Sequence, residues 1–403
     1  MSRQLHLNAS QLVSWLFADR ETVPMTMIAL VGTGFVADYY MTTLANYPEL
    51  RIAGVWDHEV ERLDQFCSFH GVRAYGSLED CLSDPDVAIV INLTNPESHF
   101  TLNCAALNTG KHVYCEKPLG MNFEEAREVV ELAGRKGLTV CGAPANGLSD
   151  AHDLVASLIA AGRIGAPRLA YAEMEDGPVF KDNWMEWRSR SGAKWPGAHE
   201  FEVGCTLEHA GYGLSWLVSL FGAVEKGQAF SALTFPDKGP GASDLAMGSD
   251  FAVGCLSFRS GVTARLTCGL AAPRDRSLTI VGEEGTIVVR DLWDDRSPVH
   301  LSRFDEKRPF LQRLAGRFER KRGQVLPLRL LHGRPVTYPA PPKAGKLAAF
   351  PSQIDFARGI AVMADAIATG QTPFFSGKRA LHLTELALAI NAGVGTFTPR
   401  SDF

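Results

Sequence analysis

The segment LVGTGFVA, residues 30–37, follows a short apolar run and precedes a stretch with helical periodicity. Its spacing is G-x-G-x-x-A, with Gly32 and Gly34 in the expected turn and Ala37 at the start of the expected helix. Small residues at these places permit a tight turn, close approach of a pyrophosphate to the backbone, and close packing of the helix. The phosphates would face the N-terminus of that helix. The segment therefore predicts a strand, turn and helix that bind a dinucleotide.

An acidic residue ends the next apolar run. Asp57 stands 23 residues after Gly34, near the spacing at which a carboxylate accepts hydrogen bonds from the adenosine ribose. This carboxylate would repel a 2′-phosphate, so we expect NAD(H) to be favoured over NADP(H). The structural alternative for Asp57 is a helix N-cap. Thr33, Phe35 and Val36, which complete the turn, are predicted to contact the same cofactor.

Two patterns divide the chain. Over residues 25–145, short apolar runs alternate with helical segments, which is typical of parallel strands joined by crossover helices in a Rossmann domain. Over residues 146–403, longer alternating runs with glycine-containing turns predict an antiparallel or mixed sheet. Two helices are expected near the C-terminus, one between Ser352 and Gly370 and one over residues 378–392. The fold class is therefore α/β, with a nucleotide-binding domain followed by a substrate domain.

Two segments fit neither pattern. Residues 1–24 are either a short helical arm or an upstream start, because Met25 immediately precedes the first apolar run. A basic insertion is expected at about 303–345, since residues 303–334 carry ten Lys or Arg against three Asp or Glu. It is read as a solvated surface insertion, with an oligomer arm or a surface for an anionic partner as alternatives.

Composition excludes several classes of protein. The 403 residues are 46% hydrophobic and 21% charged, with a net charge of −5, which argues against a surface devoted to nucleic acid or anionic lipid. The eight cysteines are scattered without a C-x-x-C pair, so we expect free thiols, a reducing cytoplasmic location and no zinc-type metal site. No apolar run reaches the roughly 18 residues of a membrane span.

Two polar segments follow apolar runs, NLTNPESH at 92–99 and CEKP at 115–118. Both should lie at the edge of the sheet where open α/β folds bind ligands. Beside an oxidised, cationic nicotinamide the protonated form of Lys117 is disfavoured, so its pKa is expected to fall toward the range useful for proton transfer. Lys117 would then deprotonate a substrate hydroxyl while hydride leaves its carbon. The alternative is a solvated cation or a surface ion pair with Glu116.

GTGFVA, Asp57, TNPESH, GKHVYCEKPLG and IAAGRIG, in this order, resemble the Gfo/Idh/MocA family of nicotinamide-dependent oxidoreductases. The resemblance covers nearly the whole chain from Met25, except the basic insertion, and EKP after GKHV is its most specific part. It implies that Lys117 is catalytic, that Glu116 lies by the nicotinamide ribose, and that a cis bond precedes Pro118. Thr94, Asn95 and His99 are predicted to belong to the cofactor site.

The same resemblance implies a fold and an activity. The expected fold is an N-terminal Rossmann domain plus a C-terminal α/β domain with a large open, mostly antiparallel sheet, which often forms an oligomer face, so we expect a homo-oligomer. The expected activity is hydride transfer to or from a secondary alcohol or ketone of a sugar, cyclitol or nucleotide-linked sugar.

A second motif departs from the family pattern. The family usually carries D-x-G-x-H-x-x-D on a helix, and here Glu208 stands for the first Asp and Tyr212 for the His. Tyr at this place resembles the subset with dihydrodiol dehydrogenases, where the phenol is a catalytic acid or hydrogen-bond donor. Glu208 and Tyr212 are four apart and share a helix face, so both are expected to face the substrate. Tyr212 and Lys117 would together form an acid/base relay. The alternative for Tyr212 is an interface aromatic, and His209 is either a cleft neighbour or a core histidine.

Further candidates concern the substrate. ANGLS at 145–149 replaces a frequent anion-binding segment of the family, so Asn146 is expected to act as a neutral hydrogen-bonder. Trp187 and Arg188 lie in a segment rich in Trp and basic residues, at 183–202. Trp stacks on sugars and Arg binds anions, so this segment would select an anionic sugar. The alternative is that its aromatics are core and its basic residues solvated.

Two rivals to an exchanging dehydrogenase follow from the same residues. One is a non-catalytic sensor of a sugar or cofactor on the same fold, because fold does not fix function. The other is an oxidoreductase that never releases its nicotinamide. Retention of Glu116, Lys117 and Pro118 favours an enzyme.

Overall fold

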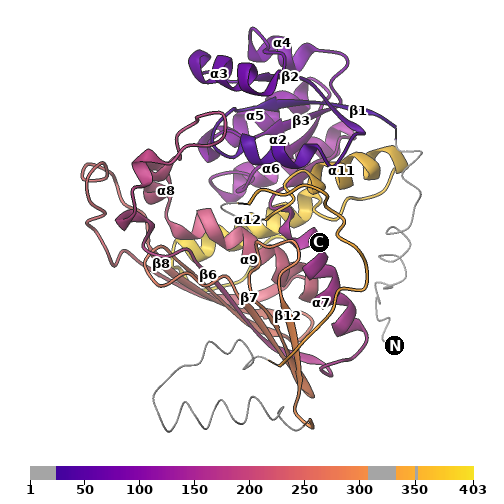
Figure 1. Ribbon diagram of the computed structural model, residues 1–403, viewed down its shortest axis with the longest axis vertical. Coiled ribbons are helices and arrows are strands. Elements are labelled where there is room, and N and C mark those ends of the chain that lie inside the picture. Colours follow the sequence, from indigo (N-terminus) through magenta and orange to yellow (C-terminus); the bar gives the residue numbers. More distant parts are fainter. Residues whose placement is uncertain (1–23, 307–332, 350–352) are drawn as a thin grey trace.

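A computed structural model describes residues 24–306, 333–349 and 353–403. Residues 1–23 and most of the predicted basic insertion therefore lie outside the described residues. Figure 1 shows two sheets, the N-terminal one at the top and a larger one below, with helices between them. This arrangement confirms the expected α/β fold with two sheets.

The N-terminal sheet has the strand order β2-β1-β3-β4-β5, and all of its pairs are parallel. Its strands lie at the apolar runs that the sequence analysis predicts as strands. Both faces of the central strands are covered by helices, so these strands are continuously apolar rather than alternating. The strands are β1 (Thr26–Val31), β2 (Leu50–Trp56), β3 (Ile89–Asn92), β4 (His112–Cys115) and β5 (Val140–Gly142).

Helices connect these strands as crossovers. In the last of them, α6, the Asn122 side chain accepts from the Glu125 N–H at the start, and Gly137 ends the helix with φ of 66°. Local polar and glycine signals thus decide where the helix begins and ends. The helices are α2 (Ala37–Leu44), α3 (Val60–His70), α4 (Leu78–Ser83), α5 (Pro96–Asn108) and α6 (Phe123–Lys136).

The larger sheet has the order β13-β12-β11-β10-β6-β9-β8-β7-β14. Only its β6–β9 pair is parallel, so the sheet is mixed and mostly antiparallel. The strands are β6 (Pro167–Glu175), β7 (Val224–Ala232), β8 (Phe251–Phe258), β9 (Thr263–Gly269), β10 (Leu278–Gly282), β11 (Gly285–Val289), β12 (Val299–Arg303), β13 (Arg334–Pro335) and β14 (Gly395–Phe397).

One face of the larger sheet carries helices. Helix α9 (Cys205–Phe221) packs on β6, β8 and β9 beside α12 (Gly377–Asn391), which contacts β7 and β8, and α9 is buried along nearly all of its length. A Cβ on Gly213 would lie 2.7 Å from the Leu266 side chain, so glycine is what lets α9 approach β9. The other helical segments of this part are η2 (Ala145–Leu148), α7 (Asp150–Ala160), η3 (Val179–Lys181), η4 (Trp184–Glu186), α8 (Gly197–Val203) and α11 (Arg358–Thr369).

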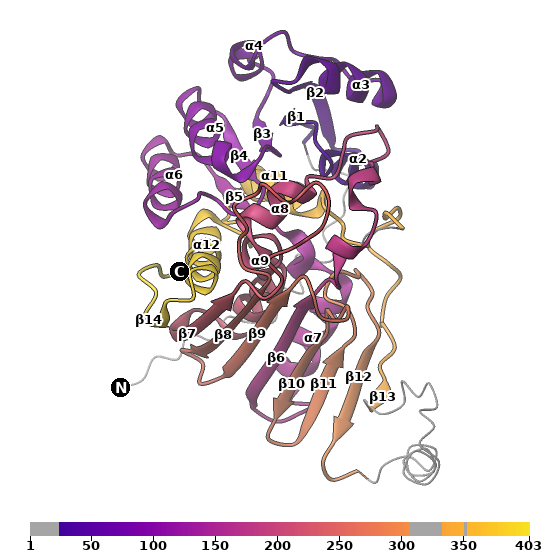
Figure 2. The same cartoon turned by 90° about the vertical axis from the view of Figure 1, so that its left-hand side faces the viewer.

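The other face of the larger sheet is seen in Figure 2, where no helix of the described ranges covers it. Its strands alternate in burial, and the outward side chains include large apolar ones. Leu169 and Tyr171 of β6 are 38% and 36% exposed, and Phe230 of β7 is 57% exposed. An apolar sheet face of this kind is available for contact with another protein surface.

The C-terminal helices return to the first domain. Helix α12 packs against α6 and β5 as well as against α9, so it ties the two sheets together. Helix α11 begins at Arg358 and ends before Gly370, whose φ is 69°. The expected start soon after Ser352 is wrong, because residues 353–357 form a loop and turn before the helix, in which the Phe356 ring packs on Tyr40 of α2.

Three general properties of the chain are also visible. All eight cysteines are free thiols, and five of them are buried. No helix within the described ranges combines the length and apolar character needed to cross a membrane. In the same ranges, no three His, Cys, Asp or Glu side chains are grouped so as to hold a metal ion.

Candidate active site

The turn between β1 and α2 has the geometry of a phosphate-binding turn. Gly32 has φ of 99°, and a Cβ there would lie 2.8 Å from the carbonyl carbon of Leu93, so only glycine fits. At Gly34, by contrast, a Cβ would meet no described atom within 4 Å. Helix α2 begins without a side-chain cap, and the open space beside Gly34 lies at the N-terminus of this helix, where a phosphate is favoured. The turn therefore fits a dinucleotide pyrophosphate.

Asp57 is fixed at the end of β2 by five hydrogen bonds. Its Oδ2 accepts from the N–H and hydroxyl of Thr33 at 2.7 and 2.9 Å, and its Oδ1 accepts from the Glu59 N–H at 2.9 Å. Arg62 donates from Nε and Nη2 at 3.0 and 2.6 Å. Burial raises the pKa of Asp57, but Arg62 and the backbone donors outweigh it, so the pKa is lowered. Glu59 is the N-cap of α3, so the carboxylate of Asp57 does not serve as that cap.

The loop after β3 is held by His99. This histidine is fully buried, with Nδ1 2.6 Å from the Pro118 carbonyl oxygen and Nε2 2.9 Å from that of Thr94. Asn95 is the N-cap residue of α5 and is exposed. His99 therefore joins the two loops predicted to surround the nicotinamide, and burial lowers its pKa.

Lys117 lies at the C-terminal end of β4, and the Lys117–Pro118 bond is cis. Its Nζ is 2.8 Å from Oε2 of Glu208, which comes from α9 of the other domain. The neighbouring Glu116 is buried, where its Oε1 accepts from the Tyr40 hydroxyl at 2.6 Å and its Oε2 accepts from the Lys117 N–H at 3.1 Å. Lys117 thus stands between the two domains. Tyr40, on α2, was not predicted from the sequence.

The contacts that this chain itself provides raise the pKa of Lys117, whereas the expected fall concerns Lys117 beside an oxidised nicotinamide. Burial by itself lowers this pKa, but the carboxylate of Glu208, with smaller contributions from Tyr212 and Glu116, raises it above its usual value. Burial raises the pKa of Glu208, and Lys117 more than offsets that effect, so the pKa of Glu208 is lowered. The two groups form an ion pair. The sequence analysis assigned Glu208 to the substrate and did not foresee this pairing.

A second carboxyl belongs to the same electrostatic group. Burial and the charge of Glu208 raise the pKa of Glu200, on α8, well above its usual range. Its surroundings therefore favour the protonated form of Glu200, whereas Lys117 favours the ionised form of Glu208. This residue was also missed, because nothing in the sequence near Gly197–Val203 links it to Lys117.

Tyr212 lies one turn after Glu208 on α9. Nζ of Lys117 is 5.8 Å from the centre of its ring, and the Trp293 ring is 4.8 Å away. Burial raises the pKa of Tyr212, so the phenol stays protonated at neutral pH. Within the described ranges no hydrogen bond engages its hydroxyl. A Cβ on Gly211 would lie 3.8 Å from the Lys117 side chain, an ordinary van der Waals contact, so the approach of Lys117 to α9 does not depend on glycine there.

His209 is paired rather than packed in an apolar core. Its Nε2 lies 3.1 Å from Oδ2 of Asp176, which follows β6. Its ring centre is 6.0 Å from that of Trp293. Burial raises the pKa of Asp176, and His209 more than offsets it, so the pKa is lowered. His209 is therefore a buried neighbour of Tyr212 with its own carboxylate.

Trp293 and Arg276 complete this side of the site and were not predicted. The Arg276 guanidinium lies 3.9 Å from the centre of the Trp293 ring. Arg276 donates to Oδ2 of Asp291 at 2.9 and 3.2 Å and lies 3.7 Å from Asp176. The cation is thus already compensated by carboxylates. Its neighbourhood offers little positive charge for an anionic substrate.

Asn146 has a different task from the predicted one. It is 3% exposed, and its amide N–H groups donate to the carbonyl oxygens of Tyr212 and Leu292, both at 3.1 Å. Its Oδ1 accepts from the Ser215 hydroxyl at 2.9 Å. Both donors are used within the protein, so Asn146 holds α9 and the segment of Trp293 in place rather than reaching a substrate.

The Trp-rich segment packs on itself and on the first domain. The centre of the Trp187 ring lies 4.9 Å from that of the Trp195 ring. The exposed side chain of Arg188 donates to the carbonyl oxygens of Met185 and Trp187. Ser191 donates from its N–H and hydroxyl to Oδ2 of Asp38 on α2, at 3.1 and 2.8 Å. The segment is therefore a strap between the domains, next to the helix that follows the phosphate turn.

Comparison with known proteins agrees with this geometry. Residues 26–142 match the model of an oxidoreductase family with an NAD-binding Rossmann fold, and residues 152–288 match the GFO/IDH/MocA C-terminal domain. Among solved structures, the WlbA dehydrogenase of Bordetella pertussis, in complex with NADH and UDP-GlcNAcA, superposes with a TM-score of 0.68 at 17% identity. That alignment covers 94% of this chain and 99% of the other and supports the fold.

Two curated relatives are similar in sequence. The trans-1,2-dihydrobenzene-1,2-diol dehydrogenase of Oryctolagus cuniculus is 27% identical over 64% of this chain and 73% of its own length. The 1,5-anhydro-D-fructose reductase of Ensifer adhaerens is 31% identical over 36% of this chain and 43% of its own length. One name describes a dehydrogenase of a diol and the other a reductase of an anhydrofructose.

Proposed function

The chain belongs to the GFO/IDH/MocA oxidoreductase family, and on that basis we propose that it transfers hydride between a nicotinamide cofactor and a secondary alcohol or ketone of a sugar, cyclitol or nucleotide-linked sugar. The observation that carries the proposal is the convergence of Lys117, Glu208 and Tyr212 at the ligand-binding edge of the N-terminal sheet, with Nζ of Lys117 2.8 Å from Glu208. A diol dehydrogenase and a sugar reductase among the relatives support this substrate class.

Lys117 is the main acid/base group, and Tyr212 is the second proton donor. When bound, a nicotinamide supplies or accepts the hydride. In the reducing direction Lys117 and Tyr212 are both protonated, so they stabilise the developing alkoxide and one of them gives it a proton. In the oxidising direction the same pair removes the hydroxyl proton as hydride leaves the carbon. Glu208 orients Lys117, and Glu116 is expected to position the nicotinamide ribose.

The cofactor is proposed to be NAD(H) in preference to NADP(H). Asp57 is ionised and lies where the adenosine ribose is expected, so it disfavours a second negative charge there. Arg62, bonded to both oxygens of Asp57, partly compensates that charge. Fluorescence titration with NADH and NADPH measures the preference, and a lower dissociation constant for NADPH would contradict it.

The substrate is proposed to be a hydroxyl-bearing molecule without an anionic group next to the reacting carbon. Glu208 lies one turn before Tyr212 and Asp176 pairs with His209, while Arg276 donates to Asp291 and lies 3.7 Å from Asp176. Such a surface suits the donor hydroxyls of a sugar or cyclitol better than a carboxylate or phosphate. The Arg188 side chain donates to the carbonyl oxygens of Met185 and Trp187, so it gives no support to the contact with an anionic sugar that was expected from the sequence.

The activity is tested by incubating the purified protein with sugars, cyclitols and nucleotide sugars and either cofactor. The absorbance of the reduced nicotinamide is followed. Turnover of an uncharged polyol or its ketone supports the proposal. Tight NADH binding without turnover of any class would instead favour a sensor on the same fold.

A retained cofactor is the second candidate, and the strap between the domains favours it. Ser191 bonds Asp38 next to the phosphate turn, so this strap lies near the path by which a dinucleotide would leave. Mass spectrometry of the denatured protein distinguishes the two candidates. A stoichiometric nicotinamide would support retention, and its absence would support exchange.

The remaining proposals concern organisation. We assign residues 25–145 to the nucleotide-binding domain and 146–403 to the substrate domain. A homo-oligomer would bury the uncovered face of the larger sheet, where Leu169, Tyr171 and Phe230 are exposed. Light scattering tests it, since a charged residue in place of Tyr171 should yield a smaller particle. A cytoplasmic location agrees with the free thiols.

A further inference from the structure

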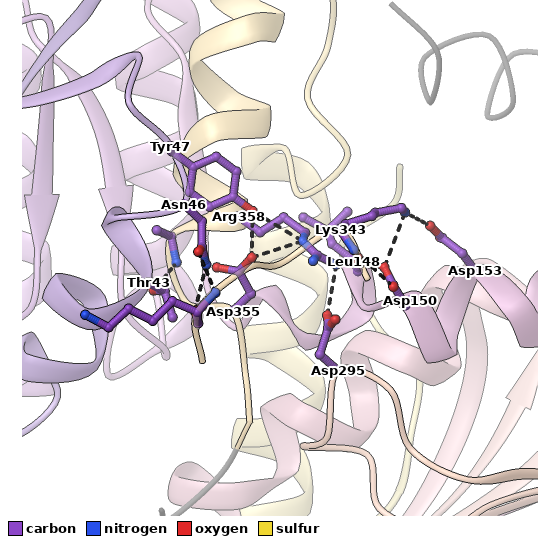
Figure 3. A network of polar contacts seen from close by, with 12 residues as sticks. Thr43, Asn46, Tyr47, Leu148, Asp150, Asp153, Asp295, Lys343, Asp355 and Arg358 are labelled. Atoms are coloured by element: carbon purple, nitrogen blue, oxygen red, sulfur yellow. Dashed lines mark hydrogen bonds and ion pairs between the residues drawn. The ribbon is translucent and has the colours of Figure 1, made fainter. Parts of the chain in front are cut away.

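A buried polar network lies where residues 353–357, which precede α11, run beside both domains (Figure 3). Its centre is Arg358, the first residue of α11, which is 6% exposed. Nη1 of Arg358 donates to the Leu148 carbonyl oxygen at 2.7 Å and lies 2.9 Å from Oδ1 of Asp295. Nε lies 3.4 Å from both the Tyr47 hydroxyl and Oδ2 of Asp355. One guanidinium therefore contacts groups in both domains.

On one side the network reaches the helix that follows the phosphate turn. The Tyr47 hydroxyl, just after α2, donates to Asp355 at 2.7 Å. The Thr43 hydroxyl of α2 accepts from the Ala357 N–H at 3.0 Å. Helix α2 also carries Tyr40, whose hydroxyl bonds the carboxylate next to Lys117. Arg358 is thus linked to the acid/base lysine through α2.

On the other side the network reaches the helix of the proposed second donor. Leu148, whose carbonyl accepts from Arg358, is the last residue of η2. Two positions earlier in η2, Asn146 donates to the backbone oxygen of Tyr212 and accepts from Ser215. A shift of η2 would therefore move Tyr212 and, with it, Glu208.

The charges around Arg358 explain why an arginine is required. Asp150, Asp295 and Asp355 are all buried within its reach, at 3.7, 2.9 and 3.4 Å. The planar guanidinium donates in two directions at once, whereas a lysine ammonium is a single point of charge. A lysine would keep the charge balance but would not bridge Leu148 and Tyr47 together.

We propose that Arg358 is a positioning residue that sets α2, and through it Lys117, relative to α9 and Tyr212. This inference rests on the proposed function, because it assigns a role in the same reaction. The phosphate turn and the substrate helix each keep their own contacts without Arg358. Its loss should therefore spare cofactor affinity and impair the step that needs both domains in register.

The test compares Arg358→Lys and Tyr47→Phe with Arg259→Gln, a control that removes an exposed ion pair with Asp402. Three quantities are measured: the dissociation constant for NADH, kcat and KM with the best substrate, and energy transfer from tryptophan to bound NADH. For R358K we expect kcat to fall about tenfold to a hundredfold while NADH affinity stays within about twofold. For Y47F, which loses one hydroxyl, we expect a fall of about threefold. Energy transfer should drop in both, because the tryptophans of the larger domain move relative to the cofactor.

A merely structural role would lower the melting temperature and the fraction of active protein without changing kcat per bound NADH. Wild-type kcat and energy transfer in both variants would overturn the proposal. If R358K fails to fold, Y47F decides by the same readings. If the wild type binds NADH but turns over no substrate, the proposed function fails, and energy transfer alone then decides the role of Arg358.

Discussion

The phosphate turn and the substrate side of the cleft are built in opposite ways. At the turn, Gly32, Gly34 and Asp57 belong to one strand, turn, helix and strand unit. Gly32 forms the tight turn, Gly34 borders open space, and Asp57 accepts from the Thr33 N–H. On the substrate side, Lys117 and Glu208 come from segments 91 residues apart, and the charges there are balanced by pairs. A motif thus identifies the first region, whereas the chemistry of the second depends on which distant groups meet.

The largest effect should come from removing the group that joins the two regions. Replacing Lys117 with Met should lower kcat by about a thousandfold, because general acid/base catalysis of this size is lost. NADH affinity should stay within about twofold, since the phosphate turn is untouched. Steady-state kinetics and fluorescence titration measure both, with K136M on exposed α6 as control. Turnover close to the control would contradict the assignment of Lys117.

Substitutions of the two glycines of the turn distinguish an effect on folding stability from an effect on cofactor binding. Gly32→Ala should cost about 1–3 kcal/mol of stability, because its φ is positive and its Cβ would meet the backbone of Leu93. Gly34→Ala should leave stability within about 0.5 kcal/mol and weaken NADH binding by about tenfold or more, since its Cβ would enter the space meant for the pyrophosphate. Denaturant unfolding and NADH titration make the comparison. Equal NADH affinity in G34A and wild type would place the cofactor elsewhere.

Replacing Glu208 tests the substrate side of the cleft through the pH dependence of the reaction. The ion pair raises the pKa of Lys117, so proton acceptance from an alcohol is delayed to high pH. Glu208→Gln removes that charge and lowers the pKa, so the rise of alcohol oxidation with pH should move down by about one pH unit. The pH profile of kcat/KM measures it, with E124Q on the surface as control. An unmoved or upward-shifted profile would show that another group titrates.

Replacing Arg62 should have the smallest effect, and the change should be limited to cofactor binding. Without it Asp57 keeps its charge uncompensated, so Arg62→Gln should weaken NADPH binding by about tenfold and NADH binding by less than about threefold. Fluorescence titration of R62Q against R73Q, which removes an exposed arginine of the same domain, measures the ratio. Equal losses for the two cofactors would assign Arg62 a structural role only.

Much of the fold follows from local sequence. The short apolar runs over residues 25–145 predict parallel strands, which the structure confirms. Helix α6 likewise begins and ends at local signals, the Asn122 cap and Gly137. The start of α11 was misjudged because Ile354 and Ala357 continue its apolar spacing into a loop and turn, where the Phe356 ring packs on Tyr40 of α2. Periodicity alone does not tell a helix face from a loop that packs on a neighbour.

The site was less predictable for a physical reason. Asp176, Arg276 and Trp293 stand at the ends of separate strands of the larger sheet, and no local spacing connects them with Tyr212. Their only sequence signal is a polar or aromatic residue just beyond an alternating run. The raised pKa of Lys117 likewise depends on Glu208, which the chain brings near only after folding.

The central claim is hydride transfer to a carbon held by Lys117 and Tyr212. The most direct measurement gives the protein NADH with deuterium at both positions of C4 of its nicotinamide ring, together with the best ketone of the panel, and analyses the product by mass spectrometry. We predict deuterium on the new carbinol carbon with wild type and almost none with K117M. A reduced product without deuterium, or equal labelling by both proteins, would contradict the account.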